Sequence, residues 1–152
     1  MIEMADRAAQ SSALLAIEAK GDEVRRASVW LEQTGRQQGV PAEQIGRLEL
    51  CLNEAVANVI AHGGSGAAFA PVWLRLEVKR KSDCSEASVT VSDAGPAFDS
   101  TSGPLKPRPA TLSDAEPGGL GLAMIRSFCD ALAYRRVDGR NELTFSVRWG
   151  EA

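Results

Sequence analysis

The chain has 152 residues, of which 44% are hydrophobic and 24% are charged, which is typical of one soluble globular domain. Its net charge of −3 and its pI near 5.2 argue against a general binder of nucleic acid or anionic membranes, which is normally basic. The three cysteines form no C-x-x-C pair, and the sequence shows neither a signal peptide nor a membrane-spanning run. We therefore expect a single cytoplasmic domain over residues 1–152.

The first half of the chain predicts one strand followed by two helices. Residues 12–19 read as an edge strand, and Asp22 is the N-cap candidate of a helix that ends at one of the glycines before Pro41. Because proline suits the first position of a helix, Pro41 begins a second helix, which runs to about His62.

The second half predicts strands interrupted by one helix. Alternating apolar residues begin a strand at Val72, and a second strand follows a polar turn. Residues 98–117 contain four prolines and no periodic element, which is typical of a long functional loop. A glycine run then opens a third helix, and two final strands follow around residues 133–137 and 141–149.

This order of elements predicts an α/β fold. Hairpin-like neighbours indicate a mixed, mostly antiparallel sheet, and each strand has one polar face. In the last strand, the inward-facing residues are Leu143, Phe145, Val147 and Trp149. We therefore expect a two-layer sandwich in which three helices cover one face of the sheet.

The second helix carries a polar stripe. Glu54 and Asn58 lie four residues apart, so both side chains point the same way, with His62 one turn further on. The residues beside this stripe are small, namely Cys51, Ala57 and Ala61. This leaves room for a ligand, although a plain solvated face is the alternative. An amide oxygen at Asn58 suits Mg²⁺, and Glu54 could accept a proton from a hydroxyl near that metal.

Two further segments have residues that are typical of ligand sites. Asp93-Ala94-Gly95 follows a strand, and a carboxylate there can accept a hydrogen bond from an exocyclic amine such as that of adenine; a turn capped by its own aspartate is the alternative. Residues 118–122 read Gly-Gly-Leu-Gly-Leu at a helix start, where backbone N–H groups favour phosphate; a flexible hinge is the alternative. This run matches neither a Walker A loop nor a Rossmann loop.

Taken in order, these three motifs closely resemble the nucleotide site of the GHKL ATPase superfamily, to which gyrase and histidine kinases belong. Within it, the chain is most similar to bacterial anti-sigma-factor serine/threonine kinases, whose Glu-Ala-x-x-Asn-x-x-x-His pattern is matched at Glu54, Asn58 and His62. The resemblance runs over residues 14–149. It implies the Bergerat, or histidine-kinase-like ATPase, fold, with residues 98–117 as the ATP lid.

The same resemblance implies ATP or ADP and Mg²⁺ as cofactors, and it assigns a role to individual residues. Glu54 would be the base that deprotonates a substrate serine or threonine, and Asn58 would hold the metal nucleotide. Asp93 would bind the adenine amine, and Gly95 would form the turn beneath the base. The remaining candidates would meet the phosphates, and they are Gly118, Gly119, Leu120, Gly121, Leu122, Lys106 and Arg108.

The resemblance implies a protein serine/threonine kinase that is also an anti-sigma factor in a partner-switching pathway. It would sequester a sigma factor until an antagonist (anti-anti-sigma) protein, itself the phosphorylation substrate, displaces it. Arg25 and Arg26 are the candidate partner contacts, a homodimer is expected, and neither nucleic acid nor a membrane is a direct partner. One alternative is a binding module of the same fold that transfers no phosphate. A weaker one is the detached catalytic half of a histidine kinase, in which an Asn normally stands in place of Glu54.

Overall fold

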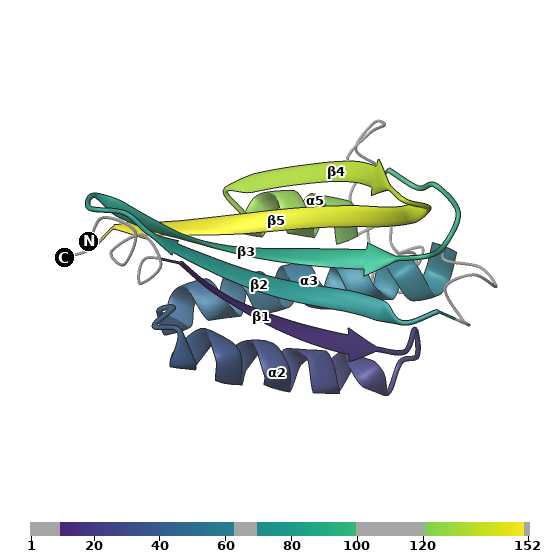
Figure 1. Ribbon diagram of the computed structural model, residues 1–152, viewed down its shortest axis with the longest axis horizontal. Helices are drawn as coiled ribbons and strands as arrows, with labels where there is room; N and C mark the ends of the chain where they lie inside the picture. Colours follow the sequence, from purple (N-terminus) through teal and green to yellow (C-terminus); the bar gives the residue numbers. More distant parts are fainter. Residues whose placement is uncertain (1–9, 63–69, 100–120, 151–152) are drawn as a thin grey trace, which may run out of the picture.

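The computed structural model describes residues 10–62, 70–99 and 121–150, and for residues 121–124 it describes the backbone alone. Figure 1 shows that the helices of this part of the chain lie on one side of a single sheet, whose strands follow the order β1-β2-β3-β5-β4. The elements are β1 (Gln10–Ile17), α2 (Glu23–Gln37), α3 (Ala42–His62), β2 (Val72–Arg80), β3 (Cys84–Asp93), α5 (Gly121–Phe128), β4 (Ala131–Val137) and β5 (Arg140–Gly150). The predicted two-layer α/β sandwich is therefore confirmed.

All four strand pairings within the described residues are antiparallel, which agrees with the mostly antiparallel sheet that the sequence predicted, but the parallel pair of a mixed sheet is not found among them. The reason lies in where β5 is inserted. β3 and β4 are both antiparallel to β5, so they run in the same direction, as expected for strands joined across one helix. Because β5 lies between them, they form no parallel ladder.

The hydrophobic core lies between the sheet and the helices. Strand alternation points every second residue of β2, β3 and β5 at the helices, and the apolar stripe of α3 faces back at the sheet. The largest fully buried side chains include Leu31, Leu48, Leu52, Leu74, Leu76, Ile125 and Phe145. No helix in the described ranges is long and apolar enough to span a membrane.

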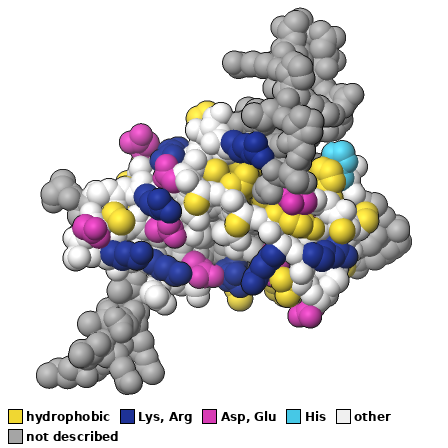
Figure 2. All heavy atoms as spheres, turned by 90° about the horizontal axis from the view of Figure 1, so that it is seen from above, with side chains coloured by type: hydrophobic (Ala, Val, Ile, Leu, Met, Phe, Trp, Pro, Cys, Tyr) yellow, Lys and Arg dark blue, Asp and Glu magenta, His cyan; other side chains and the backbone are white. Residues whose placement is uncertain are grey.

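The opposite face of the sheet is covered by paired charges. Arg75 lies 2.7 Å from Glu77, Arg148 lies 3.0 Å from Glu86, and Arg135 lies 2.8 Å from Glu142. Figure 2 shows basic and acidic side chains following one another along one side of the molecule. Exposed pairs of this kind contribute little to stability, but they keep this face solvated.

Two details of the helices concern their ends and flanks, and the first differs from the prediction. Asp22 precedes α2 but its side chain makes no capping hydrogen bond, since its own φ of −71° and ψ of −18° are already helical. Cys51, which flanks the polar stripe of α3, is fully buried, and its thiol lies 3.7 Å from the carbonyl oxygen of Ile125. That flank of α3 is therefore covered by α5. Burial raises the pKa of the Cys51 thiol to about 12.

Hydrogen bonds of Arg47 and Asp130 connect the end of α5 to α3 and β5. Arg47 Nε donates to the carbonyl oxygen of Phe128 at 2.9 Å, and its Nη2 donates to Asp130 Oδ1 at 3.1 Å. Asp130 Oδ2 accepts from the backbone N–H of Arg148 at 2.7 Å. Burial alone would raise the pKa of the Asp130 carboxyl, but the hydrogen bonds from Arg148 and Arg47 outweigh it, so the pKa is lower than usual.

Candidate functional site

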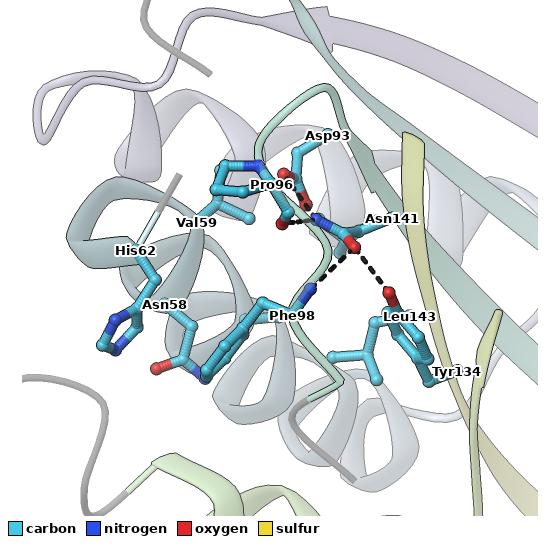
Figure 3. Close-up of a pocket in the computed structure, with 11 residues that line it drawn as sticks. Asn58, Val59, His62, Asp93, Pro96, Phe98, Tyr134, Asn141 and Leu143 are labelled. Atoms are coloured by element: carbon cyan, nitrogen blue, oxygen red, sulfur yellow. Dashed lines mark hydrogen bonds between the residues drawn. The ribbon is translucent and has the colours of Figure 1, made fainter. Parts of the chain in front are cut away.

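A pocket lies where α3, the turn after β3 and the adjoining ends of β4 and β5 meet (Figure 3). The free space inside it, part of which is open to solvent, is about 420 Å³. Its walls are apolar apart from a few converging polar groups, as in most small-molecule sites. The lining residues are Ala55, Asn58, Val59, His62, Val91, Asp93, Pro96, Phe98, Tyr134, Asn141 and Leu143.

Asn58 supplies the polar group on the α3 wall of the pocket. Its side chain is 7% exposed, and its carbonyl oxygen Oδ1 has no hydrogen-bond partner among the described residues. An unpaired buried polar atom is costly and often indicates a ligand that is bound during function. A neutral amide oxygen is a hard ligand that suits Mg²⁺. Asn58 therefore fits the metal-nucleotide role expected of it.

Glu54 lies one helical turn before Asn58 and is half-buried, but it does not form part of the pocket wall. Its carboxylate makes no hydrogen bond or ion pair with any described residue. It is thus a free carboxylate beside the pocket rather than inside it. Within the described ranges, no group of three or more His, Cys, Asp or Glu side chains could hold a metal. A metal at Asn58 would therefore need the nucleotide and water for most of its ligands.

Asp93 supplies a carboxylate on the opposite wall, at the end of β3. It is 7% exposed, and its Oδ1 accepts hydrogen bonds from the backbone N–H of Gly95 at 2.9 Å and from Asn141 Nδ2 at 3.2 Å. The two sequence interpretations of Asp93 are therefore compatible, because it caps its own turn and also lines the pocket. Gly95 is buried in that turn.

Asn141 is the residue of the site that the sequence analysis missed. Its side chain is 6% exposed and lies directly across from Asp93 in the β3–β5 register. It donates to Asp93 and to the carbonyl oxygen of Pro96 at 2.9 Å. It accepts from the hydroxyl of Tyr134 at 2.6 Å and from the backbone N–H of Phe98 at 3.1 Å, as Figure 3 shows. One amide therefore connects β3, the following turn, β4 and β5.

Arg136 completes the contacts around Asn141 from β4. Its Nη1 donates to Asn141 Oδ1 at 3.1 Å and to the carbonyl oxygen of Gly95 at 2.8 Å. A signal for Asn141 was present in the sequence, because alternation back from Leu143 places residue 141 on the inward face of the last strand. A polar side chain at an inward position needs hydrogen-bond partners, and for this residue the partners are polar groups around the pocket.

His62 and Phe98 form an aromatic pair at the mouth of the pocket. Their ring centroids are 4.7 Å apart and their planes are inclined by 19°. Both residues line the pocket, one at the end of α3 and the other after the β3 turn. Offset stacking of this kind contributes roughly 0.5–1.5 kcal/mol. The pair therefore helps to hold the β3 turn against α3.

The remaining candidate residues lie elsewhere in the chain. Gly121 and Leu122 begin α5, while Gly118, Gly119, Leu120, Lys106 and Arg108 fall outside the described residues. Arg25 and Arg26 are exposed on α2, which does not line the pocket. Arg26 contacts the carbonyl oxygen of Ala16 at 3.3 Å, whereas Arg25 makes no hydrogen bond or ion pair with the described part of the chain.

Comparison with known proteins identifies the family of this chain. The profile of the histidine kinase-like ATPase domain matches residues 17–147. The serine/threonine-protein kinase BtrW of Bordetella bronchiseptica is 36% identical over 117 residues, which are 77% of this chain and 80% of that protein.

One solved structure shares the fold. The structure of the RsbU and RsbW domains of a Mycobacterium tuberculosis protein superposes with a TM-score of 0.67 at 14% identity, over 93% of this chain. This chain spans 33% of that one. At this identity the likeness shows the shared fold alone. The SiaB–SiaC complex of Pseudomonas aeruginosa aligns with a TM-score of 0.49 at 14% identity, over 98% of this chain and 96% of that chain.

Proposed function

The chain belongs to the histidine kinase-like ATPase domain family, and from this premise we propose that it is an ATP- and Mg²⁺-dependent serine/threonine protein kinase that also acts as an anti-sigma factor. The observation that carries the proposal is the pocket with Asp93 on one wall and the unpaired Oδ1 of Asn58 on the other. The kinase BtrW, 36% identical, supports the choice of protein phosphorylation among the reactions of the family.

In the proposed reaction each residue has a distinct task. Asp93 accepts a hydrogen bond from the exocyclic amine of adenine, and Asn58 contributes one oxygen ligand to Mg²⁺, which would supply charge neutralisation at the phosphates. Glu54 takes the proton of the substrate hydroxyl, whose oxygen forms a bond to the γ-phosphorus while the bond to the bridging oxygen breaks and ADP leaves. Holding the reacting groups in place supplies most of the rate enhancement in such reactions.

The proposed partners are a sigma factor and an antagonist protein that is the phosphorylation substrate. The exposed Arg25 of α2 is free to pair with an acidic group of either partner, and Arg26 lies beside it. The resemblance to anti-sigma-factor kinases also favours a homodimer as the working unit.

The position of Glu54 favours one alternative function, a nucleotide-binding module that transfers no phosphate, because Glu54 is not on the pocket wall. The distinguishing experiment incubates the protein and labelled ATP with the antagonist that co-purifies with it. We expect Glu54→Gln to reduce labelling by about 10²–10⁴-fold, the usual range for loss of a general base, and to leave ATP affinity within about threefold. Glu49→Gln is the matched control, since Glu49 is half-buried on the same helix.

Equal labelling by Glu54→Gln and wild type would remove Glu54 as the base. ATP binding by the wild type without any labelling would favour the binding module.

Nucleotide binding itself is tested by calorimetry with ATP, with and without Mg²⁺. Asp93→Asn keeps an oxygen for Gly95 but loses a charged acceptor, so binding should weaken by about 1–3 kcal/mol. Unchanged affinity would show that Asp93 is not part of the nucleotide site.

A further inference from the structure

The hydrogen-bond partners of the Asn141 side chain determine which of its two amide atoms is the oxygen and which is the nitrogen. The backbone N–H of Phe98 can only donate, so the atom that it meets at 3.1 Å is the oxygen Oδ1. The carbonyl of Pro96 can only accept, so the atom that meets it at 2.9 Å is the nitrogen Nδ2. The same Nδ2 lies 3.2 Å from Asp93 Oδ1. Asn141 therefore always presents a donor to Asp93.

This orientation determines what Asp93 can offer to a ligand. Its Oδ1 receives two donors, Asn141 Nδ2 and the backbone N–H of Gly95. Both donate to lone pairs on that oxygen, so Oδ1 acts as an acceptor toward them. A bound molecule then meets a hydrogen-bond acceptor at this wall of the pocket.

We propose that Asn141 sets the base preference of the pocket by holding Asp93 as a hydrogen-bond acceptor, so that a 6-aminopurine binds and a 6-oxopurine does not. The inference rests on the proposed nucleotide binding and adds to it the residue that fixes the choice of base. A site built around a substrate N–H group rejects the analogue that lacks it strongly, because its own polar group is left unpaired. Asn141 touches Asp93 rather than the ligand and is thus a positioning residue.

Asn141→Asp tests this directly because it changes one end of the side chain and keeps the other. The oxygen that accepts from Tyr134, Phe98 and Arg136 is retained, while the donor to Asp93 becomes a second oxygen. Two carboxylates at this distance cannot both ionise freely, so they share a proton at low pH and repel each other at high pH. The shared proton gives this wall of the pocket a donor, which suits a 6-oxo group.

The other titratable groups that face the pair are Arg136 and Tyr134 from β4 and His62 from α3. They are the same in every variant, so the wild-type profile shows their contribution. Asn141→Ser is the second variant, since it removes the donor without adding a charge. Thr144→Val is the matched control, because Thr144 makes a 2.8 Å cross-strand hydrogen bond to Thr90, also between β5 and β3, away from the pocket.

The experiment measures dissociation constants for ATP and inosine triphosphate between pH 6 and 8 by calorimetry. These nucleotides share their ribose and phosphates and differ in the base. We expect wild type and Thr144→Val to prefer ATP by about 30-fold or more at every pH, and Asn141→Ser to lower that preference at least about fivefold. Asn141→Asp should reduce it to about fivefold or less, and its ATP affinity should fall by about tenfold as the pH rises.

An Asn141→Asp protein with the wild-type preference and a flat pH profile would overturn the inference. If that variant does not fold, Asn141→Ser is the deciding variant. An Asn141→Ser protein whose preference for ATP is unchanged from wild type would overturn the inference. A wild-type protein that binds neither nucleotide would refute the proposed function. A wild type that binds ATP selectively, together with Asn141 variants that do the same, would refute the role of Asn141 alone.

Discussion

The unpaired amide of Asn58 predicts that the protein is less stable than it would be with an apolar residue at this position. Asn58 is 7% exposed, and its Oδ1 lies in a largely apolar pocket without a hydrogen-bond partner among the described residues. Asn58→Leu replaces the amide by an apolar group of similar size and shape. Substitution of an unsatisfied buried polar group in this way is often stabilising, whereas the same change at a satisfied group is not.

The magnitude follows from the cost of leaving one polar atom desolvated. That penalty is about 1–3 kcal/mol, and part of the gain is offset by imperfect packing of the leucine, so we expect a net gain of about 1–2 kcal/mol. For a domain of this size, each kcal/mol shifts the Tm by about 2–4 °C, so the Tm should rise by about 2–8 °C. The same variant should lose the contribution of Mg²⁺ to ATP affinity, because its only change is the removal of the proposed metal ligand.

The assay combines thermal unfolding with calorimetry of ATP with and without Mg²⁺. Asn53→Leu is the control on the same helix, since Asn53 Oδ1 accepts from Ser28 Oγ at 2.9 Å and connects α3 to α2. It should lower stability by about 1 kcal/mol and keep the effect of Mg²⁺. Equal destabilisation by both variants would refute the reasoning, because it would mean that Asn58 Oδ1 has a partner of its own.

Three further predictions concern stability and thiol reactivity. Asp130→Asn should lower the free energy of unfolding by about 1 kcal/mol at pH 7, a small value because the side chain is 35% exposed. The pKa of Asp130 is lowered in the folded protein, so its contribution to stability is complete above the ordinary value of 3.8 and is lost as the pH falls through the folded pKa. The urea midpoints of variant and wild type should therefore converge in acid. Gly39→Ala should destabilise by more than about 1 kcal/mol in urea unfolding, because Gly39 has a φ of +79° and its new Cβ would collide with Arg80, whereas Gly46→Ala, with open space in α3, should stabilise by about 0.5–1 kcal/mol. Cys51 should remain unlabelled by iodoacetamide at pH 8 in the native protein, as read by mass spectrometry, because its pKa is raised to about 12; rapid labelling would show that α5 opens readily.

The elements of the fold could be predicted from sequence because each has a clear period. The polar stripe of Glu54 and Asn58 has the helical spacing, and the strands from Val72 and up to Trp149 alternate as strands with one buried face do. The sheet order could not be predicted in the same way. The insertion of β5 between β3 and β4 depends on contacts between distant segments, and local periodicity contains no information about them.

The polar residues of the pocket were predicted where they belong to short motifs and were missed where they do not. Asp93 and Asn58 stand in such motifs, and both line the pocket. Asn141 is 48 positions from Asp93 and belongs to no motif, so its role appears only when the two strands are paired. Likewise, only the packing of α5 against α3 shows that the side of the stripe with Cys51 is closed. The roles of the glycine run and of the lid cations stay predictions.

The two ends of the pocket differ in how completely their polar atoms are paired, and under the proposed function this difference would let one site be both selective for a base and responsive to a metal. At the proposed base end, Asn141 fixes Asp93 and the turn up to Phe98 before any ligand arrives, so discrimination between bases would need no rearrangement. At the metal end, Asn58 Oδ1 has no partner in the described structure, so a ligand there gains a hydrogen bond or metal contact without breaking an existing one. Adenosine, which has no phosphates, should therefore lose less affinity than ATP with Mg²⁺ when Asn58 is replaced by leucine. The reverse order of losses would mean that Asn58 acts on the base and that the metal is held elsewhere.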